Sequence, residues 1–468
     1  MTVALRARLR ALLGETGLIE GADDVAGYRG DLALATQGEI VCVARPRATV
    51  EAAAAVRACL DAGIAVVPRG GGTGLAGGAA PPADRPAVVV SLERMRAIRS
   101  IDPVGDIMIV EAGCTLHDAR EAAAAAGRLI GLDHGGLSSQ IGGNLSTNAG
   151  GNNVLRYGMA REQVLGLEVV LANGEVLSQL APLRKNNAGY DLKQLFLGAE
   201  GTLGLITAAA LKLRPQPAVR VTACLGLETL KAVLALFTRA RAAFGEAVTA
   251  FELIPRAGFD LHFSHSGSRR EPFPTPTPWA VLIEADSASP HFDLVGAMEA
   301  LSAAAIEDGI AVDGTIAASE AQRQALWTIR EGIALAMIET PGSLKNDVAV
   351  PVPAIEAFVI RSAAAVAALV PGCRPVPFGH VGDGNIHFNV LPPAGMPGEA
   401  FKARWAGLTE AIETVALDLG GTVSAEHGIG AIKRAALRRM RSTVELDAMS
   451  ALKAAFDPQG LINPGKIL

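Results

Sequence analysis

Short apolar runs alternate with longer amphipathic runs between about residue 40 and residue 215. Four apolar runs predict strands at 39–46, 64–68, 87–93 and 106–113. Two alanine-rich stretches with helical periodicity, each closing on a glycine, predict helices at 49–63 and 115–127. Alternation on both sides of Asn173-Gly174 predicts a hairpin over 166–179. This order of elements is typical of a mixed α/β domain, and the proline-rich "RPQPA" at 214–218 predicts its boundary.

A second pattern begins after this boundary and extends to about residue 420. Strands are expected at 220–227 and 279–286, and alanine-rich helices at 229–244, 294–308 and 355–369. This alternation predicts an α+β layer sandwich, interrupted by a proline-rich loop at 270–279. Beyond residue 420 the pattern predicts a loop, a helix around 430–455 and an irregular tail.

The stretch "VPFGHVGDGNIHFNV" at 376–390 predicts a hairpin that turns at Asp383-Gly384. In a two-residue turn His380 is directly opposite His387, with Phe378 and Asn389 on the same face. The other face carries apolar residues and looks like core: Val381, Ile386, Phe388 and Val390. Two adjacent imidazoles resemble two of the three protein ligands of a metal site, although a lone histidine is more often a core or surface residue.

Composition narrows the class of protein. The 468 residues are 50% hydrophobic with a net charge of −5, which describes a globular chain and argues against a general nucleic-acid binder. The mass corresponds to about three domains or two larger ones. Five scattered cysteines without framework spacing favour a reducing compartment. The first 17 residues predict a short amphipathic helix without a signal-peptide core, and no apolar run reaches the length of a transmembrane helix.

Two glycine-rich stretches predict contact with a nucleotide. The first contains Gly72-Thr-Gly74-Leu-Ala-Gly77 after a strand, the spacing of a dinucleotide-binding fingerprint. Pro81-Pro82 prevents the helix that such a fingerprint must open, so the loop is better interpreted as an anion cradle of bare N–H groups than as a Rossmann NAD site. The second stretch, 134–158, has no clear periodicity. A long loop of small residues allows the backbone to approach a large flat ligand closely.

Several motifs in this order resemble a known superfamily. "PRGGGTGLAGG", "IGGNLSTNAGG", "LRYG", "VLGLEVVLANGEVL" and "LRKNNAGYDLKQLFLGAEGTLGLIT" resemble the FAD-binding domain of the vanillyl-alcohol-oxidase superfamily. The hairpin at 376–390, "SAEHGIG" and "FDPQGLINPGKIL" narrow the resemblance to its D-2-hydroxyacid dehydrogenases, which include D-lactate and D-2-hydroxyglutarate dehydrogenases. The similarity covers about residues 40–468.

The resemblance implies an α+β fold with a PCMH-type FAD-binding domain of two subdomains. The expected parts are an N-terminal helical segment (1–37), the FAD-binding domain (38–216), an α/β substrate or cap domain (217–425), and a C-terminal segment that returns to the FAD domain (426–468). FAD is expected to be dissociable, because the first glycine loop has no histidine for a covalent link.

The resemblance also assigns residues to FAD. A pyrophosphate cradle is implied at Pro68, Arg69, Gly70, Gly71, Gly72, Thr73, Gly74 and Gly77. The flavin and ribityl chain would be lined by Leu137, Ser138, Gly142, Asn144, Thr147, Asn148, Gly150 and Gly151. Contacts on the adenine side are implied for Glu200, Gly204 and Ile206, and Asn463 would fold back towards the isoalloxazine.

For the chemistry, the family pattern implies that His380, His387 and Glu426 bind a divalent metal, Zn²⁺ or Mn²⁺. Imidazole nitrogen and carboxylate oxygen suit these ions, and open coordination positions would take the hydroxyl and one carboxylate oxygen of a 2-hydroxy acid. His427 is then expected to be the general base, with hydride transfer to flavin N5 leaving a 2-keto acid.

Recognition of the substrate carboxylates requires cations. Arg330 and Lys345 occupy positions where relatives that act on 2-hydroxyglutarate have substrate-binding residues, and Asn389 is either a third contact or a structural hydrogen-bonder. Ala334 replaces a hydroxyl residue common in those relatives, which weakens the glutarate assignment. Tyr190 and Lys193 could approach the ligands or serve packing and surface roles.

The interpretation favours D-2-hydroxyglutarate as the substrate, with D-lactate second. An oxidase of a non-acid alcohol and a flavin-binding subunit of a glycolate-oxidase-like complex stay open as alternatives. The electron acceptor is unknown, with a quinone, a cytochrome, an electron-transfer flavoprotein and oxygen as candidates. No nucleic acid and no transmembrane segment are expected, and a homodimer stays open. A cytoplasmic location is expected, with peripheral membrane contact left open.

Overall fold

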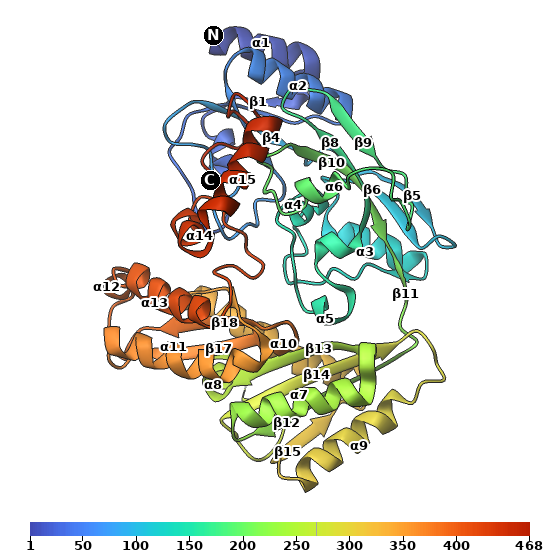
Figure 1. The fold of residues 1–468 in the computed structure, drawn as a ribbon, viewed down its shortest axis with the longest axis vertical. Coiled ribbons are helices and arrows are strands. Elements are labelled where there is room, and N and C mark those ends of the chain that lie inside the picture. The colour runs from blue at the N-terminus through green and yellow to red at the C-terminus, as the bar shows by residue number, and fades with distance from the viewer. Residues whose placement is uncertain (268) are drawn as a thin grey trace. The chain divides into compact units, whose positions relative to one another are not determined.

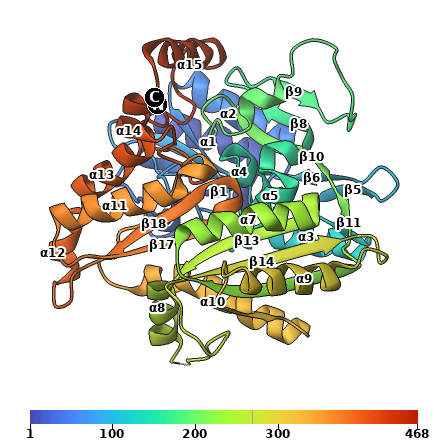
Figure 2. The same ribbon diagram turned by 60° about the horizontal axis from the view of Figure 1, so that its bottom comes forward.

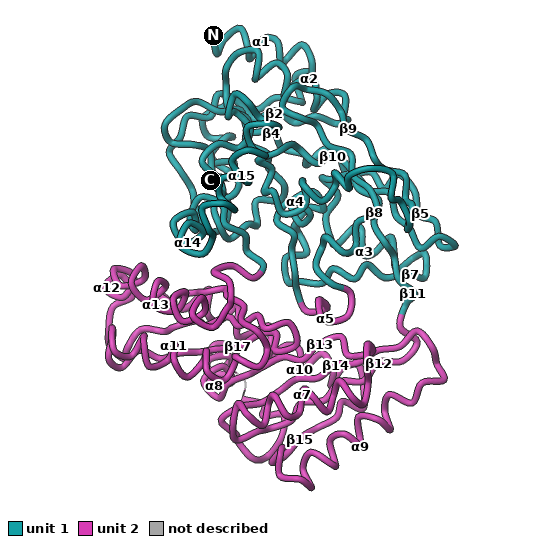
Figure 3. The backbone as a smooth tube through the Cα atoms, in the orientation of Figure 1, with its two compact units in different colours: residues 1–151, 158–216, 426–468 teal, residues 152–157, 217–425 magenta. Residues whose placement is uncertain are grey.

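The computed structural model describes residues 1–267 and 269–468, which form two compact units. Unit 1 comprises residues 1–151, 158–216 and 426–468, and unit 2 comprises residues 152–157 and 217–425 (Figure 3). Each unit is therefore built from segments that are distant in the sequence. The C-terminal 43 residues return to the unit that contains the N-terminus.

The N-terminal part of unit 1 is a small sheet covered by helices. Its strands have the order β1 (Leu18–Ile19), β2 (Ile40–Ala44), β4 (Ala87–Ser91) and β3 (Ala65–Arg69), and the last three are parallel. Helices α1 (Thr2–Leu13) and α2 (Thr49–Asp61) pack against this sheet (Figure 1). Leu5, Leu9 and Leu13 repeat every four residues and are buried, which confirms the amphipathic N-terminal helix.

The second part of unit 1 is an antiparallel sheet. Its strand order is β5 (Ile98–Asp102), β6 (Ile107–Glu111), β10 (Leu205–Lys212), β8 (Val164–Val170) and β9 (Val176–Gln179). A short ribbon joins β7 (Arg128–Leu129) to β11 (Arg214–Pro215). The chain turns between β8 and β9, where Gly174 N donates to Leu171 O at 2.9 Å and Gly174 alone is left-handed, with a φ of 76°. Helix α3 (Leu116–Ala125) begins where Thr115 Oγ1 accepts a hydrogen bond from Asp118 N.

Two expectations for irregular or continuous structure were wrong, one for the stretch 134–158, whose residues 152–157 belong to unit 2, and one for the C-terminal segment of unit 1. The stretch 134–158 is not a plain loop, because it contains α4 (Ile141–Ser146) and α5 (Val154–Tyr157), which are too short to establish a period. The helix expected around 430–455 is two helices, α14 (Arg434–Met440) and α15 (Thr443–Phe456). Ser442 separates them as the N-cap of α15, in a capping box with Glu445.

Unit 2 is a seven-stranded antiparallel sheet. Its strand order is β15 (Asp313–Ile316), β12 (Val219–Leu227), β14 (Trp279–Ser287), β13 (Val248–Pro255), β17 (Arg374–His380), β18 (Asn385–Leu391) and β16 (Val348–Ala349). Alternate residues of β14 enter different cores: Val281 and Ile283 one, Leu282 the other. The sheet is therefore covered on both faces.

The helices of unit 2 divide between these two faces (Figure 2). One core is shared with α7 (Leu230–Phe244), α9 (Leu294–Glu307), α11 (Ile355–Leu369), α12 (Gly398–Lys402) and α13 (Trp405–Asp418). The other core is shared with α8 (Arg256–Ser266) and α10 (Glu320–Glu339). We refer to this second side as the α8/α10 face, and it carries the chemistry described below.

One segment of the described chain, Val352–Leu369, is long and apolar enough to cross a membrane by length and composition alone. It contains α11, whose buried side chains Ile355, Phe358, Val359 and Val366 belong to the core of unit 2. Arg361 of this helix pairs with Asp418 of α13 at 2.8 Å. These contacts are those of a helix that packs on a sheet, and the segment is weak evidence for a membrane span.

Candidate active site

The first glycine loop leaves β3 at Arg69 and forms no helix, as the two prolines predict. Among the described residues, none accepts a hydrogen bond from the backbone N–H groups of residues 70–74. Several N–H groups without a partner in one short loop form an anion-binding concavity. The loop can therefore hold a phosphate through its backbone alone.

The Arg69 side chain makes its contacts within the protein, and its assignment to the pyrophosphate stays a prediction. Its guanidinium donates to Gly27 O at 2.9 Å and to Gly30 O, and lies over the Tyr28 ring at 5.1 Å. A Cβ at Gly72, whose φ is 71°, would clash with this guanidinium. The side chain thus ties the start of the loop to residues 27–30. With the guanidinium engaged in this way, Arg69 would contact a phosphate through its backbone.

The two glycine-rich stretches lie against each other within unit 1. A Cβ on Gly71 would stand 2.8 Å from Ser138 O, and one on Gly70 would stand 3.4 Å from the Cα of Gly143. At Gly71 only glycine permits this approach, whereas a Cβ at Gly70 would make an ordinary contact. The stretches expected to contact the pyrophosphate and the flavin are thus brought together, although they are distant in sequence.

The second stretch has an ordered interior. Asn144 is buried in α4 and donates from Nδ2 to Ser139 Oγ at 3.0 Å. Asn148 has a φ of 51°, and its Oδ1 accepts from Arg161 N at 2.9 Å. Of the other residues expected to line the flavin, Gly142, Gly150 and Gly151 are buried, Thr147 is half-buried, and Leu137 and Ser138 are exposed. Their assignment to the flavin stays a prediction.

The C-terminal tail packs beside the first glycine loop. Asn463 N donates to Val66 O at 2.7 Å, which pins the tail along β3. Asn463 Nδ2 donates to Gly78 O at 3.1 Å and to Glu200 O at 2.8 Å. Its Oδ1 is buried and has no partner among the described residues. A buried acceptor is normally satisfied, so this atom indicates a missing donor at the loop.

Glu200 anchors the segment that follows Glu426 and His427. Its Oε1 accepts from Ile429 N and its Oε2 from Gly430 N, both at 2.7 Å. Burial raises the pKa of Glu200, although these two hydrogen bonds act in the opposite direction. Both oxygens are engaged within the protein, so its expected contact on the adenine side stays a prediction.

The other two residues expected on the adenine side are Gly204 and Ile206. Ile206 is buried in the core of unit 1, and a Cβ on Gly204 would clash with Val169.

The cradle of unit 1 fits FAD on three observations. The N–H groups of residues 70–74 suit a pyrophosphate, and glycines keep the surface open for a large ligand. Gln140 Oε1 and His134 Nε2, both in the second stretch, are also buried and lack a partner among the described residues. Ligand polar atoms would satisfy such groups.

The hairpin of unit 2 differs from the expected register. Its turn is longer, because residues 381–383 form a 3-10 turn and Gly384 is left-handed with a φ of 82°. His380 is opposite Asn385, and His387 is opposite Phe378, so the direct pairing of the two histidines was wrong. The pairing of the two strands differs from the predicted one by two residues, so both histidines stay on the predicted face of the hairpin. Ile386, Phe388 and Val390 are fully buried on the other side, as predicted.

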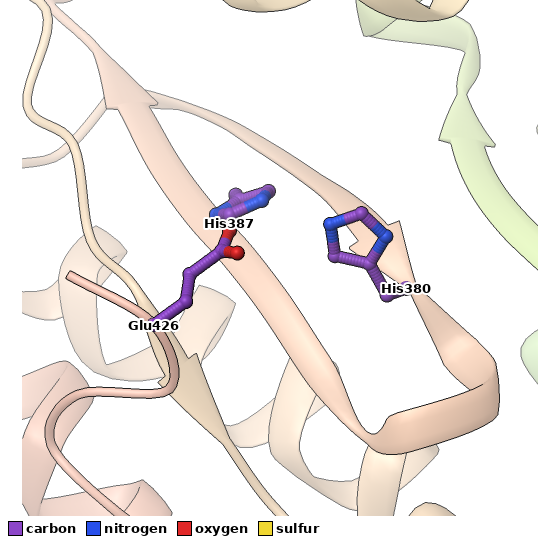
Figure 4. A group of neighbouring side chains, drawn as sticks. All are labelled: His380, His387 and Glu426. Carbon is purple, nitrogen blue, oxygen red and sulfur yellow. The ribbon is translucent and has the colours of Figure 1, made fainter. Parts of the chain in front are cut away.

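The two imidazoles nevertheless lie together. Their ring centroids are 5.5 Å apart at an interplanar angle of 77°. Glu426 directly follows Ala425, the last residue of unit 2, and its carboxylate lies beside His387 (Figure 4). One ligand atom from each of His380, His387 and Glu426 lies within 4.8 Å of the others. Asp347, Glu426 and His427 form a second group by the same criterion.

Two buried carboxylates that the sequence interpretation missed face these histidines. Glu252 Oε1 accepts a hydrogen bond from His380 Nδ1 at 2.7 Å. Asp347 Oδ1 is 3.9 Å from His387 Nδ1, within ion-pair range. Imidazoles that bind metals usually turn one nitrogen to a carboxylate, which leaves the other for the ion. The only available signal for Glu252 was a single acidic residue inside the apolar strand "VTAFELIP".

Glu252 also pairs with Arg330 of α10, whose Nε donates to Oε2 at 2.8 Å. Burial raises the pKa of Glu252, but the charges and hydrogen bonds of His380 and Arg330 outweigh it and hold this pKa at about 2. Glu252 is therefore ionised at neutral pH. The Arg330 guanidinium lies over the Phe378 ring at 4.9 Å, and no described residue accepts a hydrogen bond from its Nη atoms.

The other residues expected to bind the substrate have mixed placements. Asn389 Oδ1 accepts from Asn346 N at 3.0 Å, which supports its structural role. Lys345 is exposed, and desolvation by neighbouring atoms lowers its pKa. Tyr190 is 94% exposed, whereas Lys193 is half-buried and its Nζ pairs with Asp191 at 2.6 Å.

Comparison with known proteins identifies two conserved domain families and a set of relatives. The model of the C-terminal domain of FAD-linked oxidases matches residues 216–467, and an FAD-binding domain model matches residues 40–179. D-2-hydroxyglutarate dehydrogenase of Bos taurus, a mitochondrial protein, is 37% identical over 440 residues, or 92% of this chain and 77% of that protein. The protein of the same name from Stutzerimonas stutzeri is 34% identical over 99% of this chain and 98% of that protein.

A solved structure shares the fold. The structure of p-cresol methylhydroxylase with substrate bound has a TM-score of 0.79 and 17% identity, with 99% of this chain and 96% of that chain covered. This similarity confirms the PCMH-type fold. From the two matched domains and these relatives, we conclude that the chain belongs to the FAD-linked D-2-hydroxyacid dehydrogenase family, oxidoreductases that act on CH–OH groups.

Proposed function

We propose that this protein oxidises D-2-hydroxyglutarate to its 2-keto acid, with a divalent metal ion at His380, His387 and Glu426. The observation that carries the proposal is the group of two imidazoles and one carboxylate, in which each imidazole also faces a buried carboxylate through Nδ1. The names of the curated relatives support the choice of substrate. Neither the Bos taurus nor the Stutzerimonas stutzeri protein has D-lactate in its name.

Unit 1 is proposed to hold FAD. The N–H groups of residues 70–74 would hold the pyrophosphate, and the stretch 134–151 would line the flavin. FAD, when bound, supplies the acceptor of the hydride at N5. The protein contributes orientation and exclusion of water around the reacting carbon, through a cradle in which glycines let the backbone approach closely.

The second group, which consists of Asp347, Glu426 and His427, suits proton transfer. A divalent cation, when held by the two histidines and Glu426, supplies positive charge that favours the alkoxide of the substrate. His427 is the proposed general base for the hydroxyl proton, because an imidazole titrates near neutrality. Asp347 is in one group with His427 and is 1% exposed, so its carboxylate can orient the imidazole and stabilise its charged form.

Arg330 is proposed to bind the carboxylate of the substrate that is distant from the reacting carbon. Its Nη atoms form the side of the guanidinium that suits bidentate pairing with a carboxylate. Ala334 lies one helical turn later and offers no hydroxyl, so selectivity for the glutarate would depend on Arg330 and Lys345. Asn389 is a further candidate contact through its Nδ2.

The experiment that tests this function is a substrate panel. The purified flavoprotein, supplied with Zn²⁺ or Mn²⁺ and an artificial electron acceptor, is assayed with the D- and L-forms of 2-hydroxyglutarate, lactate and malate. We expect D-2-hydroxyglutarate to have the highest kcat/KM and its L-form to be inactive. Equal turnover of a simple alcohol with no carboxylate would contradict the proposed substrate class.

FAD is expected to be released by acid. Denaturation with acid followed by centrifugation should leave the yellow colour in the supernatant, because no histidine in the first glycine loop can form a covalent bond to the flavin. The absorbance of supernatant and washed pellet measures this directly. Flavin that stays in the pellet would require a covalent attachment elsewhere in the chain.

The remaining assignments stay predictions: a quinone, a cytochrome or an electron-transfer flavoprotein as the acceptor, a cytoplasmic location, a homodimer, and the roles of the four expected domain segments. All five cysteines are buried and unpaired, which agrees with a reducing compartment without establishing one.

A further inference from the structure

One buried carboxylate contacts both halves of the proposed site. Glu252 is 1% exposed and is the only charged residue of β13. Its two oxygens are used separately: His380 donates to Oε1 and Arg330 donates to Oε2. The first partner is a proposed metal ligand, and the second is the proposed partner of the substrate carboxylate.

The backbone sets the contact with His380. Glu252 and His380 are directly opposite each other in the β13–β17 ladder, so their side chains meet on the α8/α10 face without a long reach. In this 2.7 Å contact the carboxylate oxygen is the acceptor, so His380 carries a proton on Nδ1. Nε2 is then the ring nitrogen with a lone pair, the form that a metal ligand needs.

The contact between Glu252 and Arg330 fixes the orientation of the guanidinium. Nε is engaged with Glu252, and the Phe378 ring lies under the guanidinium plane. Arg330 is 5% exposed, so its side chain has little freedom to turn away. The Nη edge is thereby presented in one direction.

We propose that Glu252 is a positioning residue that couples metal binding to recognition of the substrate carboxylate. It fixes the tautomer and the orientation of His380 with one oxygen and the direction of Arg330 with the other. This inference rests on the proposed function, since it assigns Glu252 a role through the residues that would hold the metal and the substrate.

The isosteric variant Glu252→Gln separates this role from simple packing. A glutamine amide has one acceptor oxygen, whereas His380 Nδ1 and Arg330 Nε need two. If the oxygen serves Arg330, the amide NH₂ faces His380, and the imidazole can accept from it only by moving its proton to Nε2. If the oxygen serves His380, Arg330 loses its charged partner. Either state damages one half of the site.

The chain offers a matched control in Glu284 of β14. It is buried on the same face, where it accepts from Trp327 Nε1 at 2.8 Å and from Arg323 at 3.1 Å, both on α10. No contact joins Glu284 to His380 or Arg330 among the described residues. Glu284→Gln therefore disturbs a buried ion pair of the same kind outside the proposed site.

The test measures metal affinity and kinetics on the flavin-loaded protein. Affinity for Zn²⁺ is determined by competition with a chromophoric chelator, and KM and kcat are measured for D-2-hydroxyglutarate at saturating Zn²⁺. In Glu252→Gln we expect Zn²⁺ affinity to fall about 10- to 100-fold and KM to rise about tenfold. Arg330→Lys should raise KM alone, and Glu284→Gln should change neither value.

Each outcome is decisive. Unchanged Zn²⁺ affinity and KM in Glu252→Gln would overturn the inference. If His387→Gln binds Zn²⁺ as tightly as the wild type does, the proposed metal site fails. That result is separate from the role of Glu252. Should Glu252→Gln lose its flavin or its native circular dichroism, Glu252→Asp takes its place. It keeps the charge but shortens the reach, and equal values for it and the wild type would also overturn the inference.

Discussion

Glutamine in place of His387 is expected to lower kcat by about 10³-fold while FAD stays bound. The reason is that His387 is a proposed ligand, and loss of the ion removes the charge that stabilises the developing alkoxide. A Lewis acid contributes several kcal/mol to such a transition state, and about 4 kcal/mol corresponds to a factor of about 10³ in rate. Metal content by elemental analysis and the flavin spectrum are measured on the same preparation.

A matched control is His262→Gln, because His262 is a buried histidine of α8 in the same unit outside the ligand group. This variant should keep its metal and most of its activity. A His387→Gln protein with normal turnover and normal metal content would contradict the proposed role of the histidine pair.

Removal of the His427 imidazole is expected to lower kcat by about 10²- to 10⁴-fold, the usual contribution of a general base. In His427→Ala the deleted ring leaves space, so added imidazole should restore part of the activity in proportion to its concentration. Metal content should stay close to that of the wild type, because His427 is not one of the three proposed ligands.

His291→Ala is the control for this experiment, since His291 lies exposed in the loop before α9. It should retain full activity and show no response to imidazole. A His427→Ala enzyme that loses its metal along with its activity would instead identify His427 as a ligand.

The local elements of the fold could be predicted because each is encoded within a few residues. Leu5, Leu9 and Leu13 define the face of α1, and Thr115 with the closing Gly127 brackets α3. Pro81-Pro82 correctly excluded a helix after the first glycine loop. Such signals act through the local backbone and do not depend on contacts with distant parts of the chain.

The hairpin shows where this kind of prediction ends. Asp383-Gly384 is a strong two-residue turn signal, yet the chain forms a longer turn in which Gly384 alone is left-handed. Val381 is fully buried in the core of unit 2, as the sequence predicted, so its burial does not by itself select the turn. The face of both histidines was nevertheless predicted correctly, because a shift of two residues does not change it.

Contacts between distant segments could not be predicted from the residues alone. Glu252 meets His380 across 128 positions, and Glu200 meets Ile429 across 229. Nothing in "FELIP" or "GAEGT" shows which partner these carboxylates find. Only the order of strands in the sheet of unit 2, with β13 beside β17, puts Glu252 next to the hairpin.

The most direct measurement is anaerobic flavin reduction by D-2-hydroxyglutarate in a stopped-flow instrument, with metal-free enzyme and with the same enzyme after Zn²⁺ or Mn²⁺ is restored. We predict that the flavin of the chelated protein stays bound and oxidised, and that it bleaches rapidly once the metal is returned. Equal rates of bleaching with and without metal would contradict the account.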